Sequence, residues 1–324
     1  MKNFQLYPFK FYPILKEKVW GGSKLKELFS KASGTFIGES WELSGVPGDI
    51  SVVSNGPLKG KTLSELIDTY SYQILGERIA IKFGDKFPLL FKFIDANQDL
   101  SIQLHPDDSL AKKRHDSFGK TEMWYIMQAE EEARLIMGFN RKMDEATYKK
   151  ALSENRITEI LNSVPVKAGD SFFIPPGTVH AIGAGVVLAE IQQTSDITYR
   201  IYDWDRPGTD GKMRELHNEL ALDAIDYNAS DAKINYKESP NEAVLLKHTP
   251  FFTTKKLSLS ADMDRDVSSL DSFVVYMCVD GEGEVTVGNI SEVLKKGETV
   301  LIPAAAKEIK IRTQSATFLE VYIA

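Results

Sequence analysis

Residues that could bind a metal ion lie in three short segments of the first half of the chain. Gln103 and His105 stand two positions apart in the apolar, strand-like run Ser101-Ile102-Gln103-Leu104-His105-Pro106, so both would face the same side of a β-strand. Glu122 and His180 follow in two later segments. Imidazole nitrogens with carboxylate and amide oxygens suit zinc, and the lack of a thiolate argues against a closed structural site. The pattern predicts a catalytic metal site.

Length and net charge limit the classes of protein to which this chain could belong. A chain of 324 residues can bury a large core and is long enough for two domains, or for one domain with a strong appendage. The net charge of -7 gives no electrostatic footprint for nucleic acid, although a few local cations could still hold a small anionic substrate. We therefore expect a small-molecule substrate and no nucleic-acid partner, in a monomer or weak homo-oligomer.

The lone cysteine and the apolar runs bear on where the protein works. Cys278 cannot form an internal disulfide, which fits a reducing compartment. Residues 1–19 mix lysines with aromatics and lack the apolar core of a signal peptide. No apolar run approaches the roughly 20 residues of a membrane helix. We expect a cytoplasmic protein without a membrane partner.

The elements that must position the ligands are mainly strands. Glycine-punctuated segments in residues 1–60 indicate strands and turns, and helical periodicity predicts insertions at about 62–80, 107–118, 143–162 and 214–226. Segments 123–127 and 133–137 are predicted to form a hairpin around the acidic turn Glu130-Glu131-Glu132. A Gly-Asp turn, an apolar strand and a Pro-Gly turn then lead to His180.

Part of this plan recurs near the C-terminus. Residues 296–303 match 168–175 at a constant offset of 128, and residues 276–283 resemble 125–132 at a larger offset because the second copy lacks the helical insertion. Such similarity implies two related β-units. Glu308 stands where the repeat would place His180, and the second copy has no Gln-x-His pair. We predict a catalytic domain over 1–240 and a degenerate β domain over 241–324.

The motifs together are similar to those of one enzyme family. The Gly-Asp, Pro-x-Gly and His pattern at 169–180 resembles a motif of the cupin superfamily, small jelly-roll barrels that often bind a metal. The residues at 20–22, 101–106, 120–122, 177–181 and 190–200 resemble type I mannose-6-phosphate isomerases in their compact bacterial form, along nearly the whole chain. The resemblance implies two jelly-roll units, of which only the first is equipped, one zinc ion, and interconversion of mannose 6-phosphate and fructose 6-phosphate.

The resemblance also implies roles for individual residues. The zinc ligands fall on Gln103, His105, Glu122 and His180, and the catalytic arginine falls on Arg200. Asp196, Glu190, Lys120 and Trp20 fall on positions of the active-site cleft. Gly119 departs from the pattern, since some family members carry a histidine there, and the long helical domain of the eukaryotic form is missing.

The expected reaction removes a proton next to a carbonyl and returns it to the adjacent carbon through an enediolate. Zinc and the Arg200 guanidinium would stabilise the negative charge. Asp196, Glu190, Lys120 and zinc-bound water are all candidates for the acid or base, and Ser101, Lys120 and Arg200 are candidates for binding the phosphate. The alternatives are an isomerase of another aldose or aldose phosphate and a non-catalytic sugar-binding cupin.

Several of these side chains have a plainer structural interpretation. Trp20 could be a core aromatic instead of a wall of the cleft. Arg200 could pair with Asp203 or Asp205 at the surface. His115 is expected on an exposed helical face, His217 and His248 show no partners in the sequence, and none of the three receives a function.

Overall fold

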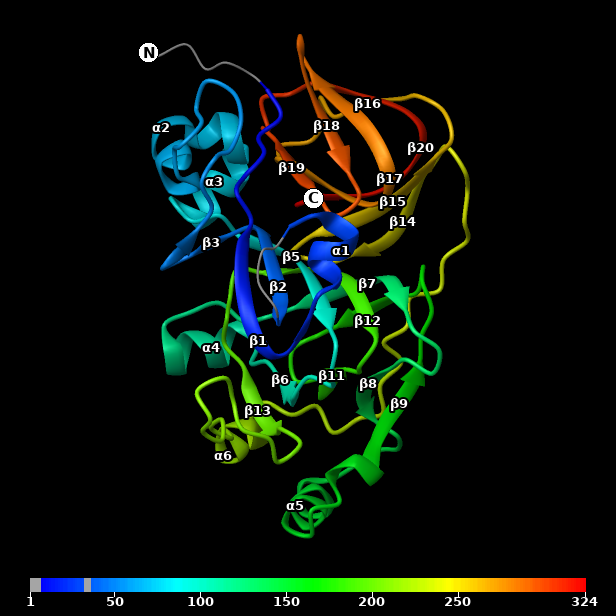
Figure 1. Cartoon of the computed structure of the whole chain (residues 1–324). Coiled ribbons are helices and arrows are strands. Elements are labelled where there is room, and N and C mark those ends of the chain that lie inside the picture. Colours follow the sequence, from blue (N-terminus) through cyan, green and yellow to red (C-terminus); the bar gives the residue numbers. More distant parts are fainter. Residues whose placement is uncertain (1–6, 32–35) are drawn as a thin grey trace.

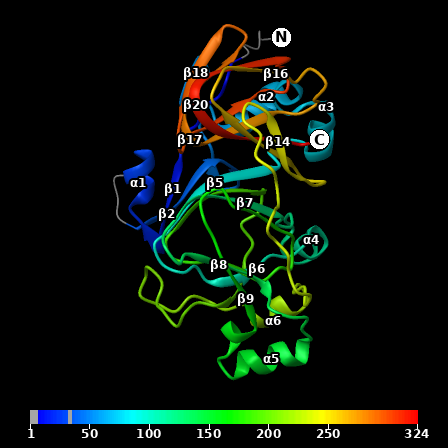
Figure 2. The ribbon, with the colours of Figure 1, turned by 90° about the vertical axis from the view of Figure 1, so that its right-hand side faces the viewer.

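The computed structural model describes residues 7–31 and 36–324 and arranges most of them in two β-units (Figures 1 and 2). The first unit consists of two facing sheets. The six-stranded sheet has the order β1 (Ile14–Gly22), β2 (Ile37–Leu43), β5 (Leu89–Ala96), β12 (Val186–Gln193), β7 (Glu122–Ala129) and β10 (Ser171–Ile174). The five-stranded sheet has the order β13 (Tyr199–Tyr202), β6 (Ile102–Leu104), β11 (His180–Ile182), β8 (Arg134–Phe139) and β9 (Leu161–Pro165).

The second unit is a curved seven-stranded sheet. Its main path is β14 (Ala243–His248), β15 (Thr253–Leu259), β20 (Glu308–Tyr322), β17 (Val274–Val287) and β18 (Ile290–Lys295). β16 (Met263–Asp266) pairs with β20, and β19 (Thr299–Ile302) pairs with β17. A two-stranded ribbon, β3 (Gly45–Val46) and β4 (Asp49–Ile50), lies outside these sheets. The mainly β class predicted from the sequence is confirmed.

Short helices lie at or beside the four expected insertions. They are α2 (Leu63–Leu75), α3 (Glu77–Phe83), α4 (Asp108–His115), α5 (Glu145–Ser153), the 3-10 helix η1 (Ile157–Ile160) and α6 (Asn218–Leu222). α2 begins with a capping box between Thr62 and Glu65, and it ends at Gly76, whose φ of 92° suits glycine. None of the helices in the described residues is long and apolar enough to cross a membrane.

The two units share one hydrophobic core. Side chains alternate along β7, so Trp124 and Ile126 face the interior of the first unit, while Met123 and Tyr125 face the second. The outward side chains belong to the same buried cluster as residues of β17, Met277 among them. Figure 2 shows the six-stranded sheet lying between the five-stranded sheet and the second unit. The predicted domain boundary near residue 240 therefore divides the chain, while the buried cluster extends across both units. That boundary remains our prediction.

The predicted hairpin at 123–137 is wrong. β7 and β8 belong to different sheets and do not pair with each other, because the turn at Glu130–Glu132 carries the chain from the six-stranded to the five-stranded sheet. Both strands still point apolar residues into one interior cluster, which explains why their patterns suggested a pair. The sequence also missed α1 (Lys24–Phe29), a helix of six residues. The expected helix over 143–162 is two pieces, α5 and η1.

The predicted repeat relates equivalent strands of the two units, but the alignment of one strand pair differs by one residue from the prediction. β10 and β19 occupy equivalent positions at the offset of 128, and Glu308 begins β20 as His180 begins β11. However, Ser171 pairs with Tyr125 while Thr299 pairs with Met277, so Met277 and not Tyr276 is the counterpart of Tyr125. A shift of one residue exchanges the two faces of a strand, so this register decides which side chains face the interior.

Candidate metal centre and active-site pocket

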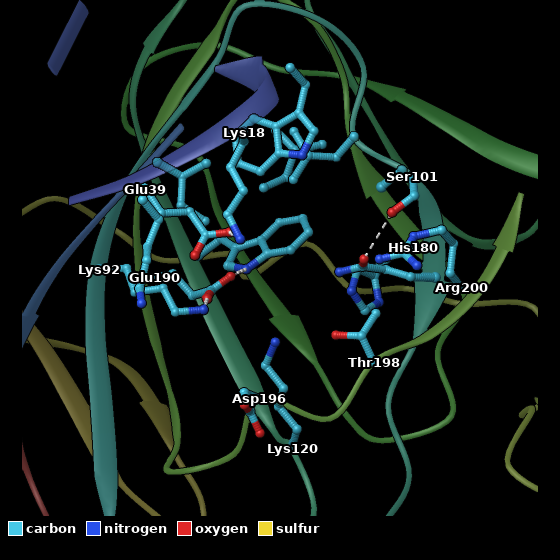
Figure 3. A pocket seen from close by; sticks show the side chains of 18 of the residues that line it. Lys18, Glu39, Lys92, Ser101, Lys120, His180, Glu190, Asp196, Thr198 and Arg200 are labelled. Carbon is cyan, nitrogen blue, oxygen red and sulfur yellow. Dashed lines mark hydrogen bonds and ion pairs between the residues drawn. The ribbon is translucent and has the colours of Figure 1, made fainter. Parts of the chain in front are cut away.

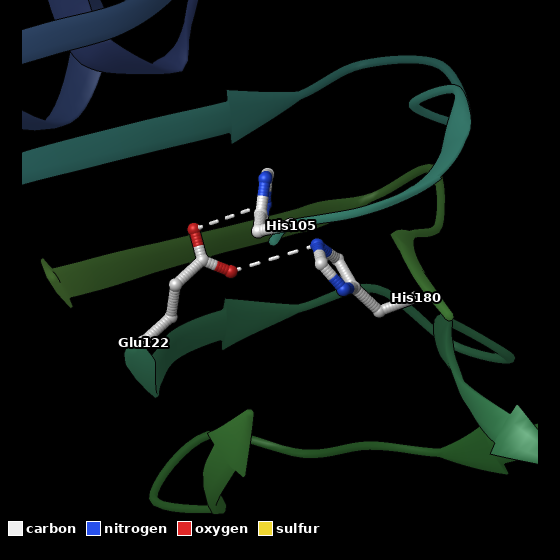
Figure 4. Close-up of side chains that lie close together, drawn as sticks. All are labelled: His105, Glu122 and His180. Atoms are coloured by element: carbon white, nitrogen blue, oxygen red, sulfur yellow. Dashed lines mark ion pairs between the residues drawn. The ribbon is translucent and has the colours of Figure 1, made fainter. Parts of the chain in front are cut away.

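His105, Glu122 and His180 converge inside the first unit (Figure 4). Their ligand atoms lie within 4.8 Å of one another, and each side chain is 1% exposed. Glu122 Oε1 lies 3.5 Å from His105 Nε2, and Glu122 Oε2 lies 3.5 Å from His180 Nε2. Within the described residues this is the one such group of His, Cys, Asp and Glu side chains.

Backbone carbonyls orient both imidazoles toward Glu122. His105 Nδ1 lies 2.7 Å from the carbonyl oxygen of Ile197, and His180 Nδ1 lies 2.8 Å from that of Thr178. A carbonyl can only accept, so each Nδ1 carries the hydrogen and each Nε2 presents a lone pair. This is the arrangement that surrounding residues impose on histidine ligands of metals.

Burial keeps the two histidines neutral. It lowers the pKa of His105 well below its usual value, assisted by the nearby Lys120 ammonium, and it also lowers the pKa of His180. Burial alone would raise the pKa of Glu122, but the nearby positive charge, above all that of Lys120, outweighs it and lowers that pKa. Glu122 Oε2 and His180 Nε2 make no hydrogen bond within the described residues. A neutral pair of imidazoles and a carboxylate with unused acceptors fit a divalent cation.

Gln103 lies beside this group. It pairs in register with His180 on one neighbouring strand and with Arg200 on the other. Its Oε1 accepts a hydrogen bond from Ser101 Oγ at 3.2 Å. Gln103 lines the same pocket as His180, and its place as the fourth ligand remains our prediction.

His180 connects this group, called the metal group below, to a pocket of about 340 Å³ that it helps to line (Figure 3). Of the residues predicted for the site, it is lined by Trp20, Ser101, Gln103, Lys120, His180, Glu190, Asp196 and Arg200. Trp20 is 3% exposed and belongs to the interior cluster, so both of its interpretations hold. Lys120 reaches the metal group, with Nζ 2.8 Å from Glu122 Oε1.

The pocket also contains residues that sequence reasoning missed. Lys92 Nζ lies 2.8 Å from Glu190 Oε1, and Trp124 Nε1 donates to Glu190 Oε2 at 2.9 Å. Next to them, Glu39 accepts a hydrogen bond from the Trp41 indole and pairs with a second lysine. The signal for Lys92 was in the sequence, as a charged residue inside the apolar strand Phe87–Ile94. Glu39 had no comparable signal.

Arg200 differs from the other cations of the pocket. The lining residues Lys16, Lys18, Lys92, Lys120 and Arg214 each form an ion pair with a carboxylate. Arg200 forms none within the described residues, so the predicted alternative of a surface pair with Asp203 or Asp205 is wrong. Asp203 pairs with Arg206 and Arg214 instead.

Two hydrogen bonds hold Arg200 in place, one from its guanidinium and one from its backbone N–H. Its Nη1 donates to the carbonyl of Glu215 at 2.9 Å, while its buried Nε has no hydrogen-bond partner among the residues that the structure describes. Its backbone N–H donates to His217 Nδ1 at 3.1 Å, so His217 is not without a partner as the sequence suggested. His115 and His248 also have partners, the hydroxyls of Tyr199 and Thr253.

Comparison with known proteins agrees with this architecture. Residues 9–132 match the family model of the phosphomannose isomerase type I catalytic domain, and residues 241–323 match that of the mannose-6-phosphate isomerase cupin domain. Mannose-6-phosphate isomerase ManA of Bacillus subtilis is 36% identical over 94% of this chain and 95% of its own length. The mannose-6-phosphate isomerase of Streptococcus mutans is 36% identical over 90% and 91%.

A solved structure extends the likeness to three dimensions. The crystal structure of the mannose 6-phosphate isomerase from Bacillus subtilis superposes with a TM-score of 0.89, at 31% identity, over 98% of this chain and 99% of that one. Sequence and fold thus agree along nearly the whole length, and the chain is an enzyme of the type I phosphomannose isomerase family.

Proposed function

We propose that the protein interconverts mannose 6-phosphate and fructose 6-phosphate, with one zinc ion held by Gln103, His105, Glu122 and His180. The observation that carries the proposal is a buried group of neutral histidines and a carboxylate at the wall of a pocket that also contains an unpaired arginine. When bound, zinc would supply positive charge beside the sugar carbonyl, which favours the negative charge of an enediolate.

Arg200 is the proposed binding partner of the substrate's negative charge. A guanidinium with no internal carboxylate partner attracts an anion without first breaking an ion pair. It could hold the phosphate or stabilise the enediolate oxygen, and Ser101, which directly precedes β6, adds a hydroxyl to the pocket. Lys120, with its ammonium beside Glu122, is close enough to the metal group to contact the sugar oxygens.

The candidates for the acid or base differ in the hydrogen bonds and ion pairs that they already make, and a group with fewer partners is freer to transfer a proton. Both oxygens of Glu190 accept hydrogen bonds, from Lys92 and Trp124, which favours a positioning role for Glu190. Asp196 is exposed to the pocket and makes no hydrogen bond or ion pair within the described residues. Asp196 therefore meets this criterion best, and Lys120, whose ammonium is already paired with Glu122, remains the second side-chain candidate for moving the proton between C1 and C2.

The test is an assay of fructose 6-phosphate formed from mannose 6-phosphate, with and without a chelator. We expect turnover that chelation abolishes and that zinc restores more fully than magnesium. An isomerase of another aldose would prefer a different sugar, and a sugar-binding cupin would form no product. Turnover that persists after complete metal removal would contradict the role of the metal.

Two further predictions accompany this function without a direct test. The lone Cys278 is buried, and we propose on that ground that the protein works in the reducing cytoplasm. We also retain the prediction of a monomer or weak homo-oligomer that acts on a small sugar phosphate and not on nucleic acid.

A further inference from the structure

Three consecutive backbone N–H groups around Lys120 are each held by a different acceptor. Gly119 N donates to Asp108 Oδ1 at 2.8 Å, and Lys120 N donates to the carbonyl of Pro106 at 3.2 Å. Thr121 N donates to Gln193 Oε1 at 2.9 Å. No regular secondary structure supplies these bonds, since β7 begins only at Glu122. Two side chains and one backbone carbonyl from other parts of the fold therefore fix this segment.

The two side-chain acceptors are also bonded to each other. Gln193 Nε2 donates to Asp108 Oδ1 at 3.0 Å, so one carboxylate oxygen receives both Gln193 and Gly119. Gln193 also donates its own backbone N–H to the carbonyl of Thr121 at 3.2 Å. Gln193 is 5% exposed and ends β12, while Asp108 begins α4. The pair therefore ties a strand and a helix to the two residues that flank Lys120.

Packing at Gly119 tightens the same arrangement. A Cβ atom at this position would lie 2.4 Å from the backbone nitrogen of Asp108 and 2.5 Å from the carbonyl carbon of Asp107. Both neighbours are backbone atoms at the start of α4, which cannot rotate away. The start of α4 thus requires glycine at 119, which accounts sterically for the missing histidine noted in the sequence.

We propose that Asp108 and Gln193 are positioning residues, which set the direction of the Lys120 side chain by fixing the backbone on both sides of it. The inference rests on the proposed function, in which Lys120 acts on the substrate. Lysine has a flexible stem, so the position of its ammonium depends on a fixed backbone as well as on the ion pair with Glu122. Without the clamp the ammonium samples a wider region, and misplacement by about 1 Å can cost on the order of 100-fold in rate.

The experiment compares Gln193→Met and Asp108→Ala with the control Asp144→Ala. Asp144 caps α5 through Thr147 N, so its removal loosens a helix that does not contact residues 119–121. We expect kcat of the two clamp variants to fall about tenfold to 100-fold with a smaller change in KM. The control should lose some thermal stability and keep its kcat.

Action through Lys120 is tested by combining variants. In a Lys120→Ala background, Gln193→Met should reduce turnover less than about twofold further, because the group that it positions is gone. The metal content should stay at the wild-type value. A full additional loss in that background, or a loss of metal from Gln193→Met, would overturn the proposal, since the effect would then run through the core or through Glu122.

Amide hydrogen exchange tests the clamp independently of whether the proposed function is correct. Exchange in a peptide covering residues 119–121 should speed up at least tenfold in Gln193→Met and remain unchanged in Asp144→Ala. This readout needs no turnover, so it also decides the case if Lys120→Ala is inactive or if mannose 6-phosphate is not the substrate. Unchanged exchange in Gln193→Met would refute the clamp even in a fully active enzyme.

Discussion

Replacing Glu39 with glutamine should destabilise the protein in a manner that depends on pH. Glu39 Oε1 lies 3.1 Å from Lys18 Nζ, Oε2 accepts from Trp41 Nε1 at 2.6 Å, and the side chain is 12% exposed. Burial alone would raise the pKa of Glu39, but Lys92, Lys18 and the Trp41 hydrogen bond lower it to about 2. The change to glutamine keeps the size of the side chain and removes the charge.

The size of the effect follows from the shift in pKa. The ordinary value is 4.5 and the folded value about 2, so the charged form stabilises the folded state by about 3 kcal/mol at pH 7. A lowered pKa contributes stability that is present above the unfolded value and is lost as the pH falls through the folded value. The contribution should decrease to about 1.4 kcal/mol at pH 3 and about 0.4 kcal/mol at pH 2.

Urea unfolding of chelator-treated wild type and Glu39→Gln across pH 2 to 7 measures this difference directly. Chelation keeps loss of the metal from contributing to the pH dependence. Glu65→Gln is the control, because Glu65 has a similarly lowered pKa but is fully exposed, where solvent screens its pair with Lys61. Glutamine also preserves the capping box of α2. If Glu39→Gln destabilises equally at pH 3 and pH 7, the carboxylate does not titrate as this reasoning requires.

Three more predictions follow from the site and the core. Arg200→Ala should keep its metal content and lose about 100-fold to 1000-fold in kcat, measured by metal analysis beside the isomerase assay; near-normal turnover would remove Arg200 from the mechanism. His180→Ala should lose both metal and activity, and retention of one equivalent of zinc after dialysis would show that His180 is not a ligand. A chain ending at residue 240 exposes the apolar face around Met123 and Tyr125, so it should aggregate on expression; a soluble, monomeric fragment with native circular dichroism would show that the units fold separately.

The sequence predicted the metal group because its signal is local. Gln103 lies in β6 and His105 directly follows that strand, and the Pro-Gly turn before β11 leads to His180. Period-2 spacing and turn residues are readable from neighbouring positions, so each ligand could be placed on its own element. Bringing the elements together required the family resemblance, since spacing along the chain does not reveal which strands face each other.

The rest of the pocket depends on tertiary contacts that no local pattern encodes. Glu39 is one of many carboxylates in the sequence, and only the pairing of β2 with β5 brings it to Lys92. The failed hairpin has the same origin, because alternation along β7 and β8 reports burial of one face and not the identity of the neighbouring strand. The role of Gln193 likewise arises where the end of β12 meets the start of α4.

Comparing the two β-units helps to distinguish pocket residues with a structural role from those proposed to act in the reaction. Glu190 pairs across strands with Trp124 and accepts its indole hydrogen, and Glu320 in the second unit pairs with Tyr276 and accepts its hydroxyl hydrogen at 2.7 Å. A cation completes each buried cluster, Lys92 in the first unit and Arg265 in the second.

The second unit repeats this glutamate cluster without the ligands of the first. Asp266 pairs with Glu308 as Gln103 pairs with His180, and Val274 faces Ile302 as Glu122 faces Ile174. The cluster therefore occurs with and without three convergent metal-binding side chains. Because the cluster does not depend on the metal group, we infer that it neutralises charge inside a β-unit. The chemistry that we propose for the first unit then rests on its other groups: the predicted ligands, Lys120, Asp196 and Arg200.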